Sequence, residues 1–246
     1  MNSDKPIKDE NEDLLGFSLP AYKLAEAIIG YKEKETFVIS IEGEWGSGKT
    51  SFMKLVENKL ENEAIIVHFN PWAIVDFEQL TRYFFDELIN TINYNLFSAK
   101  LTADAKAAVK GLQKFAAFLA PDEISHFGFT YKVKERLSPK KEQKTMYKLK
   151  NGINENLRKM DKKIVIIIDD IDRLMDKETE TLFRLIKGIA DFDNIIYILL
   201  YDKTIVGKSL EKFKGEKGEK YLDKIVQYPI IVPKPHAGVL EGLLFK

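Results

Sequence analysis

At 246 residues, the chain is long enough to form one large domain with a full hydrophobic core, and we expect residues 1–246 to be a single domain. Its 38 basic and 38 acidic residues cancel, which argues against a general nucleic-acid binder but still allows a local charged patch. The chain has no cysteine, which excludes disulfides, thiolate zinc sites and thiol nucleophiles.

The polar segment at residues 1–13 lacks the apolar core of a signal peptide. No apolar run approaches the length of about 18 residues that a spanning helix needs. We therefore expect no transmembrane segment and a cytoplasmic location. Residues 15–31 follow with a helical pattern that starts near Pro20 and places Leu24 and Ile28 on one face.

The sequence GEWGSGKT at residues 43–50 matches the phosphate-binding pattern G-x-x-x-x-G-K-[ST]. An apolar, β-branched run precedes it at residues 36–43 and an apolar helical pattern follows at residues 51–60, so strand, loop and helix come in the required order. The glycines let consecutive backbone N–H groups turn onto an anion, Lys49 can reach the β- and γ-phosphates, and Thr50 can place its hydroxyl on Mg²⁺. We predict that nucleotide is bound by Gly43, Glu44, Trp45, Gly46, Ser47, Gly48, Lys49, Thr50 and Ser51. Lys49 is also predicted to be catalytic.

After a second predicted strand at residues 64–72, stopped by Pro71, a long amphipathic helix is expected at residues 77–97. Residues 99–145 then break the alternation of strands and helices and are too long for an ordinary connection. We interpret them as a mainly helical insertion, with a helix at residues 101–120 and a short strand at residues 127–133.

The segment from Lys132 to Lys150 carries seven lysines and one arginine against two glutamates. A run of this kind is usually a solvated surface, which is the interpretation that we favour. A surface for nucleic acid or for an acidic partner is the alternative.

A second candidate site lies at residues 163–173, where a continuous β-branched run ends in carboxylates. A run that is apolar on both faces suits a central parallel strand, whose carboxyl end is where ligands bind in α/β sheets. Asp169 is placed to act on Mg²⁺, and Asp170 to orient or deprotonate an attacking water. Arg173 is predicted to contact phosphate or a neighbouring subunit, or else to pair with Asp172.

The remaining chain continues the alternation. A helix is predicted at residues 176–190 and a strand at residues 195–201. Two helices at residues 204–213 and 219–227 lead to a last strand at residues 228–233. Five strands with helical crossovers predict an α/β fold, with a parallel sheet covered by helices on both faces.

Four stretches together resemble the KAP family of P-loop NTPases, related to the STAND and AAA+ groups within the ASCE division. They are IEGEWGSGKTSFM at residues 41–53, FNPW at residues 69–72, IIIDDIDRL at residues 166–174, and YLDKIVQYPIIVP at residues 221–233. The resemblance implies a three-layer sandwich around a mostly parallel five-stranded sheet of order 5-1-4-3-2. It also implies ATP and Mg²⁺ as ligands, with Asp169 on the metal in the Walker B strand and Asp170 as the catalytic acid residue.

The chain departs from this family in two respects. Many relatives insert transmembrane helices where residues 99–145 lie, and relatives usually continue into helices that close over the nucleotide. Three explanations stay open: a short lid, a chain that is a fragment of a longer protein, or parts borrowed from a partner. Tyr201 or Asp202 stands where such enzymes sense the γ-phosphate. Trp72 is expected to pack against the second strand, and lining of the nucleotide pocket is its alternative role.

The predicted function is an ATPase, weak in isolation, that acts as a regulatory or assembly module. A role in bacterial antiphage defence follows by analogy with KAP relatives only. The alternative is a scaffold that binds ATP with negligible hydrolysis. A small-molecule kinase would need an acceptor pocket and usually an arginine-rich lid, and neither is visible in the sequence. A GTPase is disfavoured because NKLE at residues 58–61 is not N-K-x-D. The scattered His68, His126 and His236 argue against a metalloenzyme. A partner protein or self-association is expected to complete the site, with Arg173 as the candidate for the contact between subunits.

Overall fold

A computed structural model of the protein describes residues 6–73, 77–98, 102–119, 124–126, 129–131, 139–214 and 217–233. Its centre is a five-stranded sheet in which every neighbouring pair of strands is parallel. The spatial order is β2-β5-β6-β1-β7. The strands are β1 (Phe37–Glu42), β2 (Ala64–Phe69), β5 (Lys163–Ile168), β6 (Ile195–Tyr201) and β7 (Tyr228–Ile231).

The order confirms the predicted topology. Numbered along the chain, the five strands read 2-3-4-1-5, which is 5-1-4-3-2 from the other edge. β6 therefore lies between the strand of the phosphate loop and the acidic strand, as the family resemblance implies. The second strand is shorter than predicted, because residues Pro71–Ala73 form a 3₁₀ turn after Phe69. Proline cannot donate a hydrogen bond to a sheet, which explains why the strand stops there.

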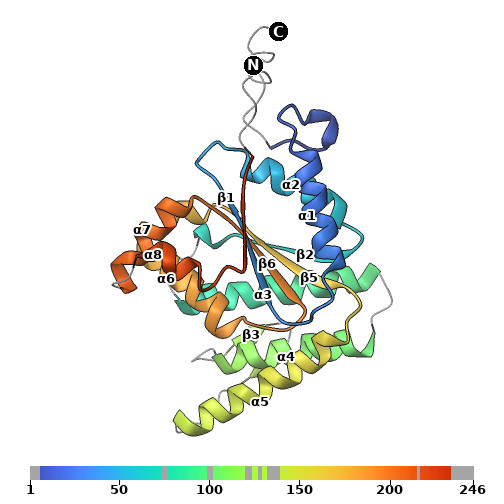
Figure 1. Ribbon diagram of the computed structural model, residues 1–246. Coiled ribbons are helices and arrows are strands. Elements are labelled where there is room, and N and C mark those ends of the chain that lie inside the picture. Colours follow the sequence, from blue (N-terminus) through green and yellow to red (C-terminus); the bar gives the residue numbers. More distant parts are fainter. Residues whose placement is uncertain are drawn as a thin grey trace.

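Helices cover both faces of the sheet and make three layers (Figure 1). α1 (Ser18–Gly30) and α2 (Lys49–Leu60) bury one face, against which Ile39 and Ile167 point. The other face carries Val38 and Ile166. It packs against α3 (Phe77–Ser98), α6 (Asp176–Arg184), which a π-helical turn (Leu185–Ile189) extends, α7 (Lys203–Lys214) and α8 (Gly218–Leu222). Consecutive residues are buried on opposite faces, and because both faces are covered these strands read as continuous apolar runs.

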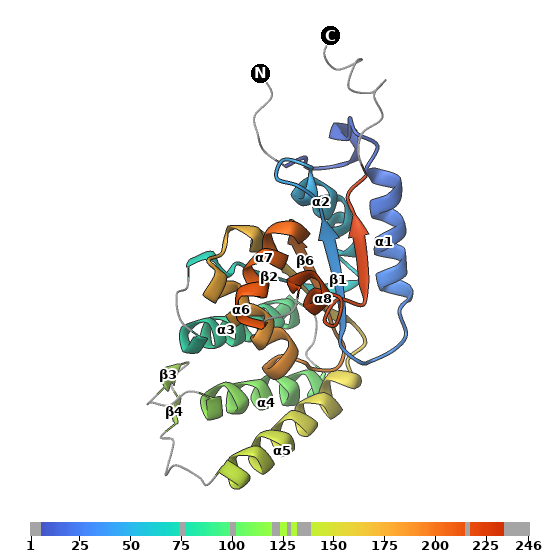
Figure 2. The ribbon, with the colours of Figure 1, turned by 60° about the vertical axis from the view of Figure 1, so that its left-hand side comes forward.

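Between α3 and β5 the chain forms an additional layer. α4 (Ala103–Leu119) packs on α3, and α5 (Pro139–Arg158) packs on α4 (Figure 2). A short antiparallel pair, β3 (Ile124–His126) and β4 (Phe129–Tyr131), belongs to the same part of the chain. The predicted strand at residues 127–133 is only partly described, and its described part is β4. The sequence interpretation did not include α5.

Both ribbon views place α4 and α5 at the end of the molecule away from the start of α2 (Figures 1 and 2). The strands point their carboxyl ends toward the start of α2, so the phosphate loop and the α4–α5 layer lie at opposite ends. Within the described ranges, no helix is both long enough and apolar enough to cross a bilayer.

Candidate nucleotide-binding site

The phosphate loop connects the end of β1 at Glu42 to the start of α2 at Lys49. Gly46 and Gly48 have φ angles of 77° and 89°, in the left-handed region that side chains disfavour. A Cβ atom on Gly48 would also lie 2.6 Å from the ring of Phe17, which is fully buried against the loop. Gly43 lacks a positive φ, but a Cβ atom there would collide with the Ser47 side chain. The loop therefore needs its glycines for two different reasons.

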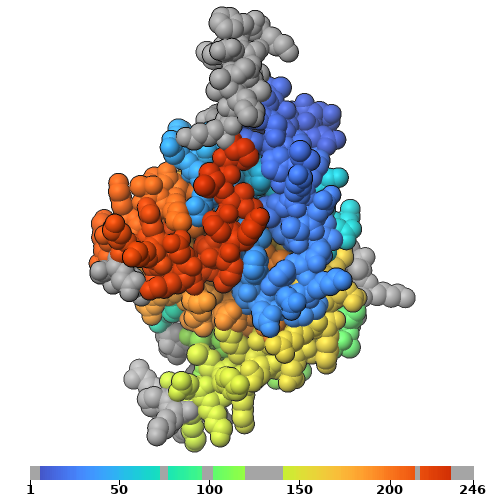
Figure 3. Space-filling model, viewed as in Figure 1, coloured from blue at the N-terminus to red at the C-terminus, as the bar shows by residue number. Residues whose placement is uncertain are grey.

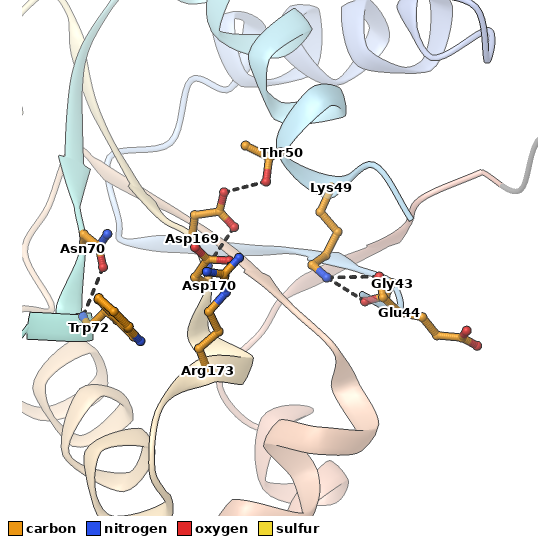
Figure 4. Close-up of polar contacts among 9 residues, drawn as sticks. All are labelled: Gly43, Glu44, Lys49, Thr50, Asn70, Trp72, Asp169, Asp170 and Arg173. Carbon is orange, nitrogen blue, oxygen red and sulfur yellow. Dashed lines mark hydrogen bonds and ion pairs between the residues drawn. The ribbon is translucent and has the colours of Figure 1, made fainter. Parts of the chain in front are cut away.

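Lys49 and Thr50 are the first residues of α2 and lie beside the acidic strand (Figure 4). The Lys49 ammonium is buried and donates hydrogen bonds to the carbonyl oxygens of Gly43 at 2.9 Å and Glu44 at 3.3 Å. The Thr50 hydroxyl donates to Asp169 Oδ2 at 2.8 Å. Residues 119 positions apart in the sequence thus meet through their side chains.

Asp169 and Asp170 follow β5 in a tight turn. Asp170 has a φ angle of 57°, and its backbone N–H donates to Asp169 Oδ1 at 2.7 Å. The Arg173 Nε lies 2.9 Å from Asp170 Oδ1, so Arg173 pairs with Asp170 of its own chain and the suggested pairing with Asp172 is wrong. Burial, and then the charge of Asp169, raise the pKa of the Asp170 carboxyl, although Arg173 and Lys49 lower it. A raised pKa brings this carboxylate closer to that of an efficient general base.

The residues at this point fit a magnesium ion. A threonine hydroxyl and an aspartate carboxylate are hard oxygen donors of the kind that Mg²⁺ prefers, and here they already lie within hydrogen-bond distance. The Ser47 hydroxyl is buried and has no hydrogen-bond partner within the described chain, which leaves one polar group of the loop for an anion.

The other predicted loop residues take different positions. Glu44 uses its carbonyl oxygen, which accepts bonds from Lys49 and from the Ser47 N–H. Trp45 is 74% exposed in the loop. The Ser51 hydroxyl accepts a bond from the Ile7 N–H at 3.4 Å and so faces the N-terminal segment.

The expectation that Trp72 packs against the second strand is wrong. The side chain is 62% exposed, because the 3₁₀ turn at Pro71 carries it out of the sheet. Figure 4 shows its ring on the side of Asp170 and Arg173, at the carboxyl end of the sheet. Its backbone N–H donates to Asn70 Oδ1 at 3.1 Å.

The two candidate sensor residues have structural partners. Tyr201 is fully buried, and its hydroxyl lies 3.4 Å from Glu42 Oε1. Burial is the largest cause that raises the pKa of Tyr201. Asp202 caps α7, because its carboxylate accepts bonds from the N–H groups of Thr204 and Ile205.

Sequence reasoning missed the buried carboxylate of Glu42, directly before the loop. It is 8% exposed and accepts hydrogen bonds from the hydroxyls of Ser40 at 2.8 Å and Tyr201. Glu42 and Tyr201 are register partners on β1 and β6. Glu42 and Tyr201 meet only because β1 and β6, which are not consecutive in the chain, pair in this register. The sequence pattern around either residue therefore does not indicate the contact.

A cavity of about 420 Å³ borders the Thr50–Asp169 pair. Its walls come from α2, from the end of β2 and from the N-terminal segment at residues 6–8, and they mix apolar side chains such as Met53 with polar ones such as Asn70. Of the three histidines, His68 lines this cavity, His126 belongs to β3, and His236 lies outside the described residues.

The chain is similar in sequence to one curated protein and in structure to several solved ones. The phage T7 exclusion protein of Escherichia coli K12 is 27% identical over 267 aligned residues, which cover 95% of this chain and 35% of the relative. Cdc6p from Pyrobaculum aerophilum is similar in structure, with a TM-score of 0.48, 12% identity, and coverage of 95% of this chain and 49% of the other. The ORC2 protein of Aeropyrum pernix, in its ADPNP–ADP complexes, has a TM-score of 0.48, 10% identity, and coverage of 99% and 54%.

The chain thus spans about a third of the length of the curated relative and about half of the solved structures. A family model, the KAP family P-loop domain, matches residues 17–246, which include the phosphate loop, the acidic strand and the last strand of the sheet. The chain therefore belongs to the KAP family of P-loop NTPases.

Proposed function

We propose that this domain binds ATP with Mg²⁺ at residues 43–51 and hydrolyses it slowly. The observation that carries the proposal is the hydrogen bond of 2.8 Å between the Thr50 hydroxyl and Asp169, which brings the ends of two nucleotide motifs together. Lys49 is buried at the same place, where its bonds to the carbonyls of Gly43 and Glu44 can be exchanged for phosphate oxygens.

In this proposal, each residue has a separate task. The loop N–H groups and Lys49 bind the phosphates, and Thr50 and Asp169 hold Mg²⁺, which neutralises phosphate charge. Asp170 orients a water and accepts its proton while the water oxygen attacks the γ-phosphorus and ADP leaves. Arg173 holds the Asp170 carboxylate at 2.9 Å and so keeps it pointed into the site.

We further propose that the ATPase serves as a regulatory or assembly module in the cytoplasm, in defence against phage. The support is the relative called phage T7 exclusion protein, of which the chain covers 35%. Self-association or a partner protein would complete the site. We also propose that residues 1–246 form a single domain, into which residues 99–145 are inserted.

A scaffold that binds ATP without turnover is the second candidate. One observation favours it: the Arg173 guanidinium beside Asp170 lowers the pKa of that carboxyl and so opposes the larger effects of burial and of Asp169. The two candidates differ in whether ATP is consumed.

Release of phosphate from ATP by the purified chain, measured with Asp170→Asn beside it, tests hydrolysis. Asparagine keeps the shape and tolerates the left-handed φ of this residue but cannot accept the proton. We expect turnover to fall by roughly 10²-fold or more while ATP·Mg²⁺ still binds. The wild-type rate should also fall on acidification, at a pH above that of an ordinary aspartate, since the pKa is raised. Equal rates for both proteins would remove Asp170 from the mechanism, and a wild type without turnover would favour the scaffold.

A further inference from the structure

The net charge of zero hides a strong separation of charge along the chain. α4 and α5 together carry nine basic and three acidic residues, and the rest of the chain holds the compensating acid. The two helices pack against each other, and Gly111 of α4 allows the close approach, since a Cβ atom there would lie 2.8 Å from Ile153 of α5. The packed pair is called the α4–α5 hairpin below.

Apart from Lys140, whose side chain the structure does not describe, the basic residues of this hairpin fall into two groups. Those near the body of the protein are paired: Lys150 with Asp191 at 4.0 Å, Arg158 with Asp193 at 2.6 Å, and Lys159, just after α5, with Asp104 of α4 at 3.7 Å. These pairs attach the hairpin to the sheet and join its two helices.

A second group is exposed and forms no ion pair with any residue that the structure describes. It forms one row on each helix, and the rows are Lys106, Lys110 and Lys114 on α4, and Lys141, Lys144 and Lys148 on α5. The spacing of three and four residues places each row along a single side of its helix. Within the described ranges, these six cations are therefore exposed and without an acidic partner.

The geometry of the rows suits a regularly charged polymer. From Lys106 to Lys114 the helix rises by about 12 Å. A duplex carries one phosphate charge per about 1.7 Å of its axis, so a stretch of this length offers about seven phosphates. Tyr147 is 67% exposed between Lys144 and Lys148 and adds an aromatic ring to the α5 row.

A lipid surface fits less well. A helix that lies on a membrane inserts its apolar face. In α5 that face is already used, because Ile153 and Leu157 are buried and Met146 and Leu149 pack against the same core. The exposed residues of α5 are polar or charged apart from Tyr147, and they include Glu142 and Glu155 beside the lysines.

We propose that the α4–α5 hairpin binds the phosphate backbone of nucleic acid without sequence preference. The surface lies at the opposite end of the molecule from the phosphate loop, as both ribbon views show, and the space-filling view shows α5 at the outer face of that end (Figures 1–3). Nucleic acid and ATP would therefore occupy separate places on one chain.

The test uses the full 246-residue chain and a fluorescent DNA duplex of about 20 base pairs, with anisotropy measured at several salt concentrations. Two variants replace the three lysines of one row by glutamine, in α4 or in α5. A matched control replaces Lys23, Lys177 and Lys208, which are exposed on α1, α6 and α7, and so removes the same charge elsewhere. Thermal unfolding confirms that all variants fold.

We expect duplex binding that weakens as salt rises. Each row variant should weaken binding about 10-fold or more at low salt and lower the salt slope by about two to three, because each phosphate contact contributes about 0.9 to the slope. The control should bind as the wild type does. No binding by the wild type, equal weakening in the control, or unchanged binding in both row variants would overturn the proposal. Row-dependent binding to anionic vesicles or to polyglutamate, without binding to the duplex, would overturn it as well.

Discussion

Gly48 shows how one missing side chain shapes the candidate site. Its φ angle of 89° ends the loop in the left-handed region, and the ring of Phe17 fills the space where a Cβ atom would project. The sequence pattern predicts a glycine here for the sake of the backbone. It does not reveal Phe17, which comes from 31 residues upstream and meets the loop only in the folded chain.

We predict that Gly48→Ala moves the loop and lowers ATP affinity about 10-fold or more, since the strained φ alone costs about 1–3 kcal/mol. Calorimetric titration with ATP·Mg²⁺ measures the effect. Gly30→Ala is the control, because Gly30 ends α1 with a negative φ and with open space around it. If Gly48→Ala bound ATP as tightly as Gly30→Ala, the loop conformation would not matter for binding.

At the scale of elements, the segment before α1 packs on the phosphate loop, where Phe17 lies against Gly48 and the Ile7 N–H bonds to the Ser51 hydroxyl. Asp13 accepts hydrogen bonds from the backbone N–H groups of Leu15, Phe17 and Ser18 and from the Ser18 hydroxyl. Burial alone would raise the pKa of the Asp13 carboxyl, but these hydrogen bonds outweigh it and lower the pKa. The ionised carboxylate therefore fixes the turn that presses Phe17 onto Gly48.

Asp13→Ala should destabilise the protein by about 1–2 kcal/mol at neutral pH, as the loss of a helix cap does. Because the folded pKa is lowered, the contribution of Asp13 is present above the unfolded pKa and is lost as the pH falls through the folded pKa. Denaturant unfolding at pH 7 and at pH 3 checks this, with the exposed Glu26→Gln on α1 as control. A cost that stayed the same at both pH values would show that the charge of Asp13 does not matter.

The elements differ in how far the sequence predicts them. The strands are local β-branched runs, so all five are found, and the family resemblance supplies their order. α5 was not predicted, because its many lysines indicated a solvated surface segment. The signal for the helix is the helical spacing of its core residues, which are Met146, Leu149, Ile153 and Leu157. The contact between Glu42 and Tyr201 depends on strand register and could not be predicted.

The same limit applies to the catalytic turn. The motif predicts Asp169 beside Thr50, because each has a known place relative to the nucleotide, and the structure brings their side chains together. The pairing of Arg173 with Asp170 depends on the left-handed φ of Asp170 and the 3₁₀ turn (Ile171–Arg173) that follows, which the sequence run did not indicate.

At the scale of the whole molecule, the acid pair of Asp169 and Asp170 is not fully enclosed, because the Asp170 side chain is 37% exposed. Of the four arginines that the structure describes, Arg173 is bonded to that pair, Arg158 pairs with Asp193, and Arg184 lies over the ring of Phe77. The fourth, Arg82, is exposed on α3. A neighbouring molecule could supply a further cation, which in related chemistry is worth about 10³–10⁵ in rate. Trp72 is 62% exposed and lies on the side of Arg173 in Figure 4, and Met175, two residues after Arg173 in the chain, is 73% exposed. Exposed apolar side chains of this kind suit such a contact.

We predict that specific ATPase activity rises with protein concentration and that ATP·Mg²⁺ shifts the chain toward a dimer or larger assembly. The physical reason is that the second molecule completes the charge around the phosphates. Light scattering and phosphate release, measured in the same dilution series, test this. A strict monomer whose specific activity is independent of concentration would show a self-sufficient site.

Calorimetric titration of ATP·Mg²⁺ into the wild type and into Lys49→Ala tests the central claim, that the loop at residues 43–50 is a nucleotide site. Lys49 would make a charge-assisted contact worth about 1.5–3 kcal/mol, so its removal should weaken binding about 10-fold or more without loss of the fold. Lys59→Ala, at the far end of the same helix, should bind as the wild type does. Unchanged affinity in Lys49→Ala, or a wild type that binds no ATP, would contradict the account.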